Sequence, residues 1–460
     1  MKMIKLLCAI LLVSAVQVLP QKETPPKGST PKDFKLAEPV KITLDNGMQA
    51  TLVNYGAIPK VTIRLTLRTG TTNENGYSTG IAGFTFDLLD EGTKTMTASQ
   101  LADNAARMGG QVSSSGGNEL SNITIDVLAD YVDEALKMIA DVVMNPAFNE
   151  SDIERLKKDY IRNISINENV PQNIADREFR KLMYGDHPLG KEATQDDVAK
   201  YTRAEVEKFY KENIGALRAH IYISGNYDIK KAGESVKKYF NGWAKGNPVV
   251  KNIPKLNNKK ELVVVERAGA PQSTINLGCP VVDISNPDYM KLSLMNTMLG
   301  GSFGSRITSN IREDKGYTYS PGSSVISRYR TAFWLMEADV TTSATGPSLT
   351  EIYYEIRRLQ NENPSESELD GIKNYSAGIF VLQNSTRQGV INQLANLDLH
   401  ELPSSYLTDY VKNIYAVTPA DISSAAKKYI DLKKMSLVVV GDKSVITEQL
   451  KAFDTDFPKN

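Results

Sequence analysis

Residues 202–206 read Thr-Arg-Ala-Glu-Val, and residues 418–422, later in the chain, read Thr-Pro-Ala-Asp-Ile. Two more pairs keep the same offset: Ser151–Glu154 with Ser367–Asp370, and Gly225-Asn226 with Gly441-Asp442. Matches at one fixed offset indicate that a single structural module is present twice. Each copy is typical of a helix begun by Ser or Thr, then a strand that ends in Gly, then another helix. The alternative is a chance similarity between amphipathic helices.

The repeat predicts two halves, residues 38–246 and residues 262–456. Between them, residues 247–261 are polar and begin with Asn247-Pro248, which is typical of a linker. The folded part, about 415 residues long, is large enough for two or more domains with sizeable apolar cores.

Both strand and helix patterns occur within each half. Residues 61–67 and 123–128 alternate between apolar and polar side chains, as half-buried strands do. Residues 131–143 and 349–359 have the period of an amphipathic helix. The sequence therefore predicts an α+β fold.

Two longer stretches resemble signature sequences of one family. Residues 80–93 read GIAGFTFDLLDEGT, and residues 299–320 read LGGSFGSRITSNIREDKGYTYS. They resemble G-L-A-H-F-x-E-H-x-x-x-x-G-T and L-G-G-x-x-x-S-R-L-x-x-x-I-R-E-x-x-G-x-x-Y of the insulinase/pitrilysin (inverzincin) zinc peptidases. The resemblance covers most of the mature chain. It implies two similar halves, each an antiparallel sheet with helices packed on one face, which form half of a clam-like peptidase chamber.

The same resemblance implies that the zinc chemistry is missing from this chain, which lacks the H-x-x-E-H motif. Gly83 and Asp87 stand where the family has its two zinc-binding histidines, and Phe86 stands in place of the glutamate base. Asn163 stands in place of the third ligand, a glutamate on a later helix. A catalytic zinc needs about three protein ligands and a base near its water. We therefore expect no cofactor in this chain, with zinc carried by a partner.

The second signature keeps the two residues that the family projects into its active site. These are Arg312 and Tyr319, which suit the orientation of a substrate carbonyl and hydrogen bonding to an oxyanion. The alternative is that Arg312 pairs with an acid such as Asp314 while Tyr319 merely packs. Arg306, in the same signature, is interpreted as structural.

A chain of this kind resembles the non-catalytic subunit of a two-chain insulinase-family peptidase. The implied partners are a zinc-bearing homologue and extended peptide substrates held along a sheet edge. The first alternative is a structural or peptide-binding paralogue with no part in catalysis, as in the core subunits of the cytochrome bc1 complex. The second alternative is a hydrolase that is active without a partner.

Composition limits the compartment and the partners. The chain has 54 Lys and Arg against 54 Asp and Glu, so its charge favours neither nucleic acid nor an anionic membrane. Residues 1–19 are typical of a secretory signal, with a retained membrane anchor as the alternative. Residues 20–37 form a Pro-rich tether. The mature chain keeps only Cys279, so no internal disulfide forms. We expect export, to the periplasm, without a stable membrane span.

Other chemistries fit the sequence less well. Residues 300–304 satisfy the G-x-S-x-G pattern of serine hydrolases, with His400 downstream, but residues 287–298 predict a helix where that motif needs a strand. The other histidines, His187 and His220, are too far apart in sequence for a local metal motif. His187 is interpreted as structural and His220 as lying in or beside a strand. Asp87, Asp90 and Glu91 share a helical face that is expected to be solvated rather than a cation site.

Overall fold

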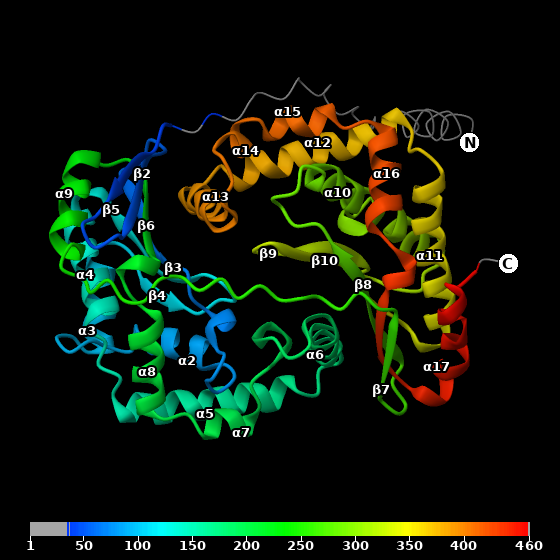
Figure 1. Cartoon of the computed structure of the whole chain (residues 1–460), viewed down its shortest axis with the longest axis horizontal. Helices are drawn as coiled ribbons and strands as arrows, with labels where there is room; N and C mark the ends of the chain where they lie inside the picture. The colour runs from blue at the N-terminus through cyan, green and yellow to red at the C-terminus, as the bar shows by residue number, and fades with distance from the viewer. Residues whose placement is uncertain (1–34, 36, 459–460) are drawn as a thin grey trace, which may run out of the picture. The chain divides into compact units, whose positions relative to one another are not determined.

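The computed structural model describes residue 35 and residues 37–458. The predicted signal lies outside the described residues, and so does the predicted tether apart from Lys35 and Ala37. None of the described helices is long and apolar enough to cross a membrane. The described chain is built on two sheets, each backed by helices (Figure 1), which confirms the expected α+β fold of two similar halves.

The first half contains a six-stranded sheet in the order β1-β2-β6-β3-β5-β4. Its strands are β1 (Val40–Thr43), β2 (Gln49–Asn54), β3 (Lys60–Leu67), β4 (Val112–Ser115), β5 (Ser121–Leu128) and β6 (Ala219–Gly225). Its helices are α2 (Ile81–Asp87), α3 (Ala98–Arg107), α4 (Val132–Met144), α5 (Glu150–Asn167), α6 (Pro171–Tyr184), α7 (Gln195–Ala199), α8 (Arg203–Asn213) and α9 (Ile229–Phe240). Helices α4 and α9 pack on one face of the sheet and enclose its apolar core.

The second half contains a five-stranded sheet in the order β7-β11-β8-β10-β9. Its strands are β7 (Glu261–Glu266), β8 (Gln272–Val281), β9 (Gly322–Arg328), β10 (Thr331–Thr341) and β11 (Ser436–Gly441). Its helices are α10 (Tyr289–Asn296), α11 (Thr345–Asn361), α12 (Glu366–Gln383), α13 (Arg387–His400), α14 (Ser405–Thr408), α15 (Tyr410–Ala416), α16 (Pro419–Tyr429) and α17 (Lys443–Leu450). Two π-helical segments, Thr297–Gly301 and Thr308–Asp314, follow α10.

The two sheets have the same topology, with β1 as the one extra strand. One expected detail is corrected, because each sheet is mixed rather than antiparallel. β2 pairs with β6 in parallel, and β7 pairs with β11 in parallel. The physical reason is the long stretch of helices and strands between the partners of each pair, since a parallel pair needs a long crossover connection.

The fixed offset seen in the sequence reappears in the elements. It relates α5 to α12, α8 to α16, and α6 to α13, because the first residues of each pair of helices are separated by that same offset. The predicted repeat is therefore a repeat of structure. The boundaries at residues 246 and 262 stay a prediction.

Helices α6 and α13 each cover the sheet of the opposite half. Helix α6 packs on β8 and β11, whereas α13 packs on β3 and β6 (Figure 1). Each sheet thus has its own helices on one face and one exchanged helix on the other. We infer that the halves share their packing and do not fold as independent units.

The two exchanged helices make contacts of different character. Helix α6 buries an apolar cluster that joins Phe179 and Met183 to Phe333 of β10 and Val438 of β11. Helix α13 has a smaller apolar cluster with β2 and β6. It adds side-chain hydrogen bonds to the sheet, such as that from Arg64 Nη1 to Asn392 Oδ1 at 2.8 Å.

Phe179→Ala is expected to lower the free energy of unfolding by about 3–5 kcal/mol, because it opens a cavity under α6. Phe179 is fully buried, and its ring lies against Phe333 and over Gly278, where a Cβ would come within 2.8 Å of the ring. Urea unfolding measures the change. The control is Phe303→Ala at an exposed phenylalanine, expected to change stability by about 0.5 kcal/mol or less. Equal effects of the two changes would contradict the prediction.

Candidate functional site

Helix α2 contains three of the four positions that are predicted to correspond to the family's zinc site, and a buried glutamate caps its start. Gly80, at the N-cap, has φ 87° and has no side chain to accept hydrogen bonds. Glu74 takes that role, since its carboxylate accepts hydrogen bonds from the backbone N–H groups of Gly80 (3.0 Å) and Ala82 (2.9 Å). Burial raises the pKa of Glu74 to about 7, although both backbone hydrogen bonds lower it.

A tyrosine lies beside Gly83 and Asp87, the two positions at which the family's histidines were expected. The hydroxyl of Tyr160, on α5, donates a short hydrogen bond to Asp87. A Cβ at Gly83 would lie 3.8 Å from the same hydroxyl oxygen. Burial raises the pKa of Asp87, and the hydrogen bond from Tyr160 partly offsets this shift. The Tyr160 hydroxyl therefore lies next to both positions.

The other two positions offer no metal chemistry. Phe86 is fully buried in the core of the first half, and Asn163 is exposed on α5, one turn beyond Tyr160. Within residues 37–458, no group of three or more His, Cys, Asp or Glu side chains could hold a metal ion. The side chains at these four positions do not fit a zinc ion. Their equivalence to the family's ligands stays a prediction.

The acidic face of α2 and the turn after it is occupied by protein contacts. Asp90 accepts a hydrogen bond from the backbone N–H of Ser114 at 2.9 Å, and burial raises its pKa to about 6. Glu91 forms an ion pair with Arg155 of α5 at 2.5 Å. These contacts tie α2 to β4 and to α5. The protein therefore engages these acidic side chains, and they are only partly exposed, so the face is less solvated than expected.

The second signature brings Arg312 and Tyr319 together. Arg312 lies in the π-helix Thr308–Asp314, and its guanidinium carbon is 4.9 Å from the centre of the Tyr319 ring and 4.4 Å from that of Phe303. Its ion-pair partner is Glu313, at 3.5 Å, rather than Asp314. The side chains of Tyr319 and Phe303 are 79% and 72% exposed. Arg312 is therefore held between two aromatic rings that face solvent.

Local hydrogen bonds fix the backbone on which this pair stands. Thr318 donates through its hydroxyl to the carbonyl of Asp339 at 2.6 Å, and the backbone N–H of Tyr317 donates to Ile311 at 2.9 Å. Ile311 is fully buried beside Arg312. Tyr319 therefore follows directly on a segment whose backbone these hydrogen bonds hold in place. A pocket of about 380 Å³ lies at the pair and is also lined by Tyr375.

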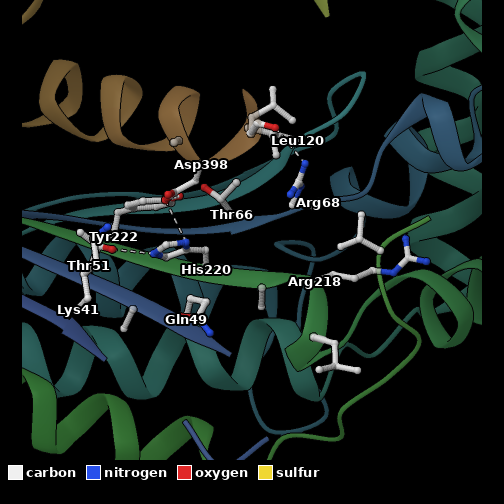
Figure 2. Close-up of a pocket in the computed structure, with 16 residues that line it drawn as sticks. Lys41, Gln49, Thr51, Thr66, Arg68, Leu120, Arg218, His220, Tyr222 and Asp398 are labelled. Atoms are coloured by element: carbon white, nitrogen blue, oxygen red, sulfur yellow. Dashed lines mark hydrogen bonds and ion pairs between the residues drawn. The ribbon is translucent and has the colours of Figure 1, made fainter. Parts of the chain in front are cut away.

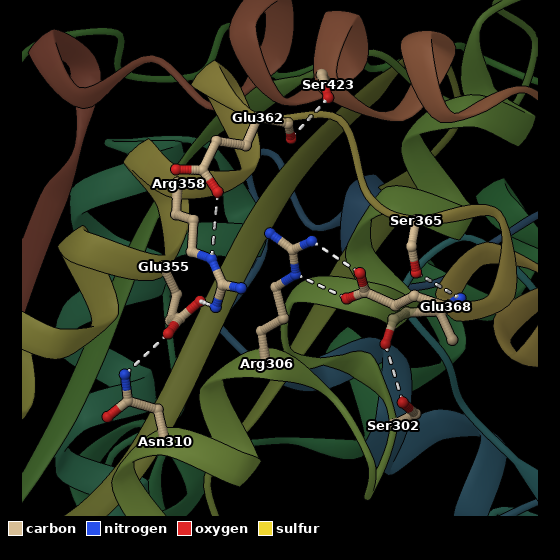
Figure 3. Close-up of polar contacts among 10 residues, drawn as sticks. Ser302, Arg306, Asn310, Glu355, Arg358, Glu362, Ser365, Glu368 and Ser423 are labelled. Carbon is tan, nitrogen blue, oxygen red and sulfur yellow. Dashed lines mark hydrogen bonds and ion pairs between the residues drawn. The ribbon is translucent and has the colours of Figure 1, made fainter.

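A polar network beneath the pocket connects it to the helices of the second half. Figure 3 shows Arg306 bound through two nitrogens to both oxygens of Glu368, at 2.7 and 2.9 Å. In the same figure Asn310 donates to Glu355 of α11. Arg306 is almost fully buried, as its interpretation as a structural residue implies.

The histidines and the G-x-S-x-G pattern have structural roles. The residues before Ser302 form a π-helix rather than a strand, so the nucleophile-elbow geometry is absent from this part of the described chain. His400 is buried, and burial lowers its pKa to about 4. His187 Nδ1 accepts a hydrogen bond from the N–H of Leu189, and His220 lies within β6.

Two profiles of one peptidase family match consecutive parts of the chain. The profile described as Insulinase (Peptidase family M16) matches residues 52–197, and that described as Peptidase M16 inactive domain matches residues 200–376. The chain belongs to the insulinase (M16) family.

Relatives in this M16 family differ in how they are described. An uncharacterized zinc protease, YmxG, of Bacillus subtilis is 24% identical over 84% of this chain and 95% of its own length. A non-peptidase homolog, also YmxG, of Helicobacter pylori is 20% identical over 84% of this chain and 90% of its own length. The M16 family thus includes chains described as proteases and as non-peptidases.

Two solved M16-like structures share the fold. The peptidase M16 inactive domain from Pseudomonas fluorescens matches with a TM-score of 0.82 and 22% identity, over 88% of this chain and 98% of that one. The periplasmic protease PqqL from Escherichia coli matches with a TM-score of 0.77 and 16% identity, over 92% of this chain and 47% of that one.

Three residues at the M16 site were not predicted from the sequence. Tyr160 lies three residues before the expected ligand position, Glu74 lies six residues before Gly80, the N-cap of α2, and Phe303 contacts Arg312 in addition to Tyr319. The one usable signal was the absence of an N-cap side chain at Gly80, which requires a cap from elsewhere.

Restoring the M16 ligands is expected to fail while Tyr160 is present. The variant Gly83→His/Asp87→His/Asn163→Glu should bind zinc weakly, because the Tyr160 hydroxyl, 3.8 Å from a Cβ at position 83, would compete for the space beside the new imidazoles. Adding Tyr160→Ala should tighten zinc binding by about tenfold or more, the scale on which neighbours of ligands act. Competition with a chromophoric chelator measures both affinities, and Tyr160→Ala alone is the control. Equal affinities would show that Tyr160 is not the obstacle.

Glu74 is expected to make the M16 fold less stable as the pH rises. Because its folded pKa of about 7 lies above the ordinary value of 4.5, its contribution is fully present below pH 4.5 and is lost as the pH rises through 7. At one pKa unit per 1.36 kcal/mol, the loss is at most about 3 kcal/mol. Urea unfolding from pH 4.5 to 8 should show a smaller slope for Glu74→Gln than for the wild type. Parallel curves would contradict the assignment.

Proposed function

We propose that this chain is the non-catalytic subunit of a two-chain M16 metallopeptidase. It completes a peptide chamber with a zinc-bearing homologue and supplies Arg312 and Tyr319 to the partner's site. The observation that carries the proposal is a contrast within one chain. Tyr160 lies against Gly83 and hydrogen-bonds to Asp87, whereas Arg312 is held against Tyr319, whose side chain is exposed.

The exposure of Tyr319 supports action on a partner's substrate. A phenol that stabilises an oxyanion does so strongly only where water is excluded. Tyr319 and Phe303 are largely exposed in the single chain, so a second surface must cover them before the phenol is effective. A homologous chain that carries substrate is a suitable cover, with Arg312 binding a peptide carbonyl and Tyr319 donating to the oxyanion.

Edge strands support a role in holding extended peptide. β4 is an edge of the first sheet and lies beside α2, and β9 is an edge of the second sheet and begins just after Tyr319. An extended peptide can add to such an edge through backbone hydrogen bonds. The function proposed is therefore proteolysis of peptides by the complex, in the periplasm, with zinc held by the partner.

Tyr319→Phe is expected to reduce peptide cleavage by the mixture of this chain with a zinc-bearing homologue. The loss of one oxyanion donor costs about 10²–10³ in kcat. The assay follows cleavage of a fluorogenic peptide with zinc present, by each chain alone and by the mixture. Arg312→Gln should act in the same direction. The matched control is Tyr375→Phe, which alters a phenol that lines the same pocket.

The alternatives give different outcomes in the same assay. If the mixture needs this chain but is unaffected by Tyr319→Phe and Arg312→Gln, the chain is a structural or peptide-binding paralogue. If this chain cleaves peptide alone, the interpretation of Gly83, Phe86 and Asp87 as a lost zinc site is wrong.

A further inference from the structure

A separate pocket of about 320 Å³ lies between the first sheet and α13 (Figure 2). Thr51 of β2, Thr66 of β3 and His220 of β6 form its floor. Asp398 of α13 and Arg68, just after β3, line its walls. These residues come from both halves of the chain, and neither the M16 signatures nor the proposed partner role uses them.

A neutral histidine holds the pocket's carboxylate in place. His220 Nε2 lies 2.8 Å from Thr51 Oγ1, and Nδ1 lies 3.2 Å from Asp398 Oδ2. The ring is stacked on Tyr222 with centroids 4.1 Å apart. Burial lowers the pKa of His220 to about 4, so at pH 7 the ring donates from one nitrogen only. Nδ1–H faces Asp398, and the Thr51 hydroxyl donates to Nε2.

One carboxylate oxygen of Asp398 has no hydrogen-bond partner among the described residues. The Tyr222 hydroxyl donates to Oδ2 at 2.6 Å, and His220 Nδ1 lies 3.2 Å from the same oxygen. Within the described chain, no hydrogen bond engages Oδ1, and the one ion-pair partner of Asp398 is the neutral His220. The side chain is 41% exposed, on the pocket side (Figure 2). Its negative charge is therefore available to a cationic ligand group.

The same pocket contains cations without carboxylate partners. Arg68 Nη2 donates to the carbonyl of Leu399 at 3.0 Å, and its guanidinium carbon lies 5.6 Å from the centre of the Tyr329 ring. Among the described residues, neither Arg68 nor Lys41, at the rim, forms an ion pair with a carboxylate. A positive and a negative group thus line one small pocket, and among the described residues neither has an oppositely charged side chain within 4.0 Å, apart from the neutral His220 beside Asp398.

We propose that this pocket binds a small zwitterion, a free amino acid or a dipeptide. The ligand's ammonium group binds Asp398 Oδ1, and its carboxylate binds Arg68, with Lys41 adding positive charge at the rim. Ligand pockets usually have volumes of about 300–1,000 Å³, so this one suits a ligand at the small end of that range. The inference is independent of the proposed partner role, because it concerns this chain alone.

Calorimetry with the purified chain at pH 7 tests the proposal. The probes are glycyl-leucine, free leucine, N-acetyl-glycyl-leucine and glycyl-leucinamide. Glycyl-leucine or leucine should bind saturably, and blocking either end of the dipeptide should weaken its binding by about tenfold or more, since each block removes a charge-assisted hydrogen bond. Comparison of leucine with glycyl-leucine then distinguishes the two sources of the zwitterion.

Two variants assign each end of the ligand to its residue. Arg68→Gln should abolish the preference for the free acid over the amide and keep the preference for the free amine. Asp398→Asn should do the reverse. The matched control is Arg107→Gln, at an exposed arginine paired with Glu134 outside this pocket, which should leave all four affinities unchanged.

Several outcomes would overturn the proposal. They are the absence of saturable binding with Kd below about 1 mM for both unblocked probes, equal affinity for blocked and unblocked dipeptides, and retention of both preferences in Arg68→Gln. If Asp398→Asn fails to fold, as judged by its thermal melt, Arg68→Gln with the acid and amide probes decides the outcome alone. Peptide cleavage is not measured in these experiments, so their failure is distinguishable from failure of the partner role.

Discussion

The exchange of α6 and α13 between the halves is the constraint on which the rest of the structure depends. Each sheet has one face that its own helices do not cover, and burial of that face requires a helix from the other half. On the α6 side the hydrophobic effect dominates, whereas on the α13 side hydrogen bonds also contribute. The polar side is where the chain leaves a pocket between its halves, because polar groups do not interdigitate as closely as an apolar core does.

Much of the fold was predictable from local sequence, and the exception is long-range pairing. The alternating stretches at residues 61–67 and 123–128 became β3 and β5, and the helix expected at residues 131–143 became α4. The parallel pairs and the exchanged helices were not predicted. Periodicity reports which face of an element is apolar, but not which distant element covers that face. The fixed offset between the two copies indicated duplication, yet it could not tell a side-by-side arrangement from an exchanged one.

The candidate site likewise contains residues that could be predicted from the sequence and residues that could not. The neighbourhood of Arg312 and Tyr319 was predictable, because a long contiguous signature carries both residues. The absence of histidine at positions 83 and 87 was visible in the sequence, but the contact of Tyr160 with Asp87 was not, since it arises where α5 packs against α2. His220 and Asp398, which lie in different halves of the sequence, meet only through the placement of α13 on the first sheet. When the role of a residue depends on which distant element packs against it, its neighbours in the sequence do not reveal that role.

The apolar face of α6 also affects how the protein is made. Synthesis runs from the N-terminus, so α6 emerges well before β8, β10 and β11, the strands that it will cover. Until these strands are made, Phe179 and Met183 lack the surface that buries them, and the first half exposes an apolar helix. Full burial therefore waits for β11, the last strand of the described chain, and an incomplete chain exposes apolar surface of the kind that chaperones bind.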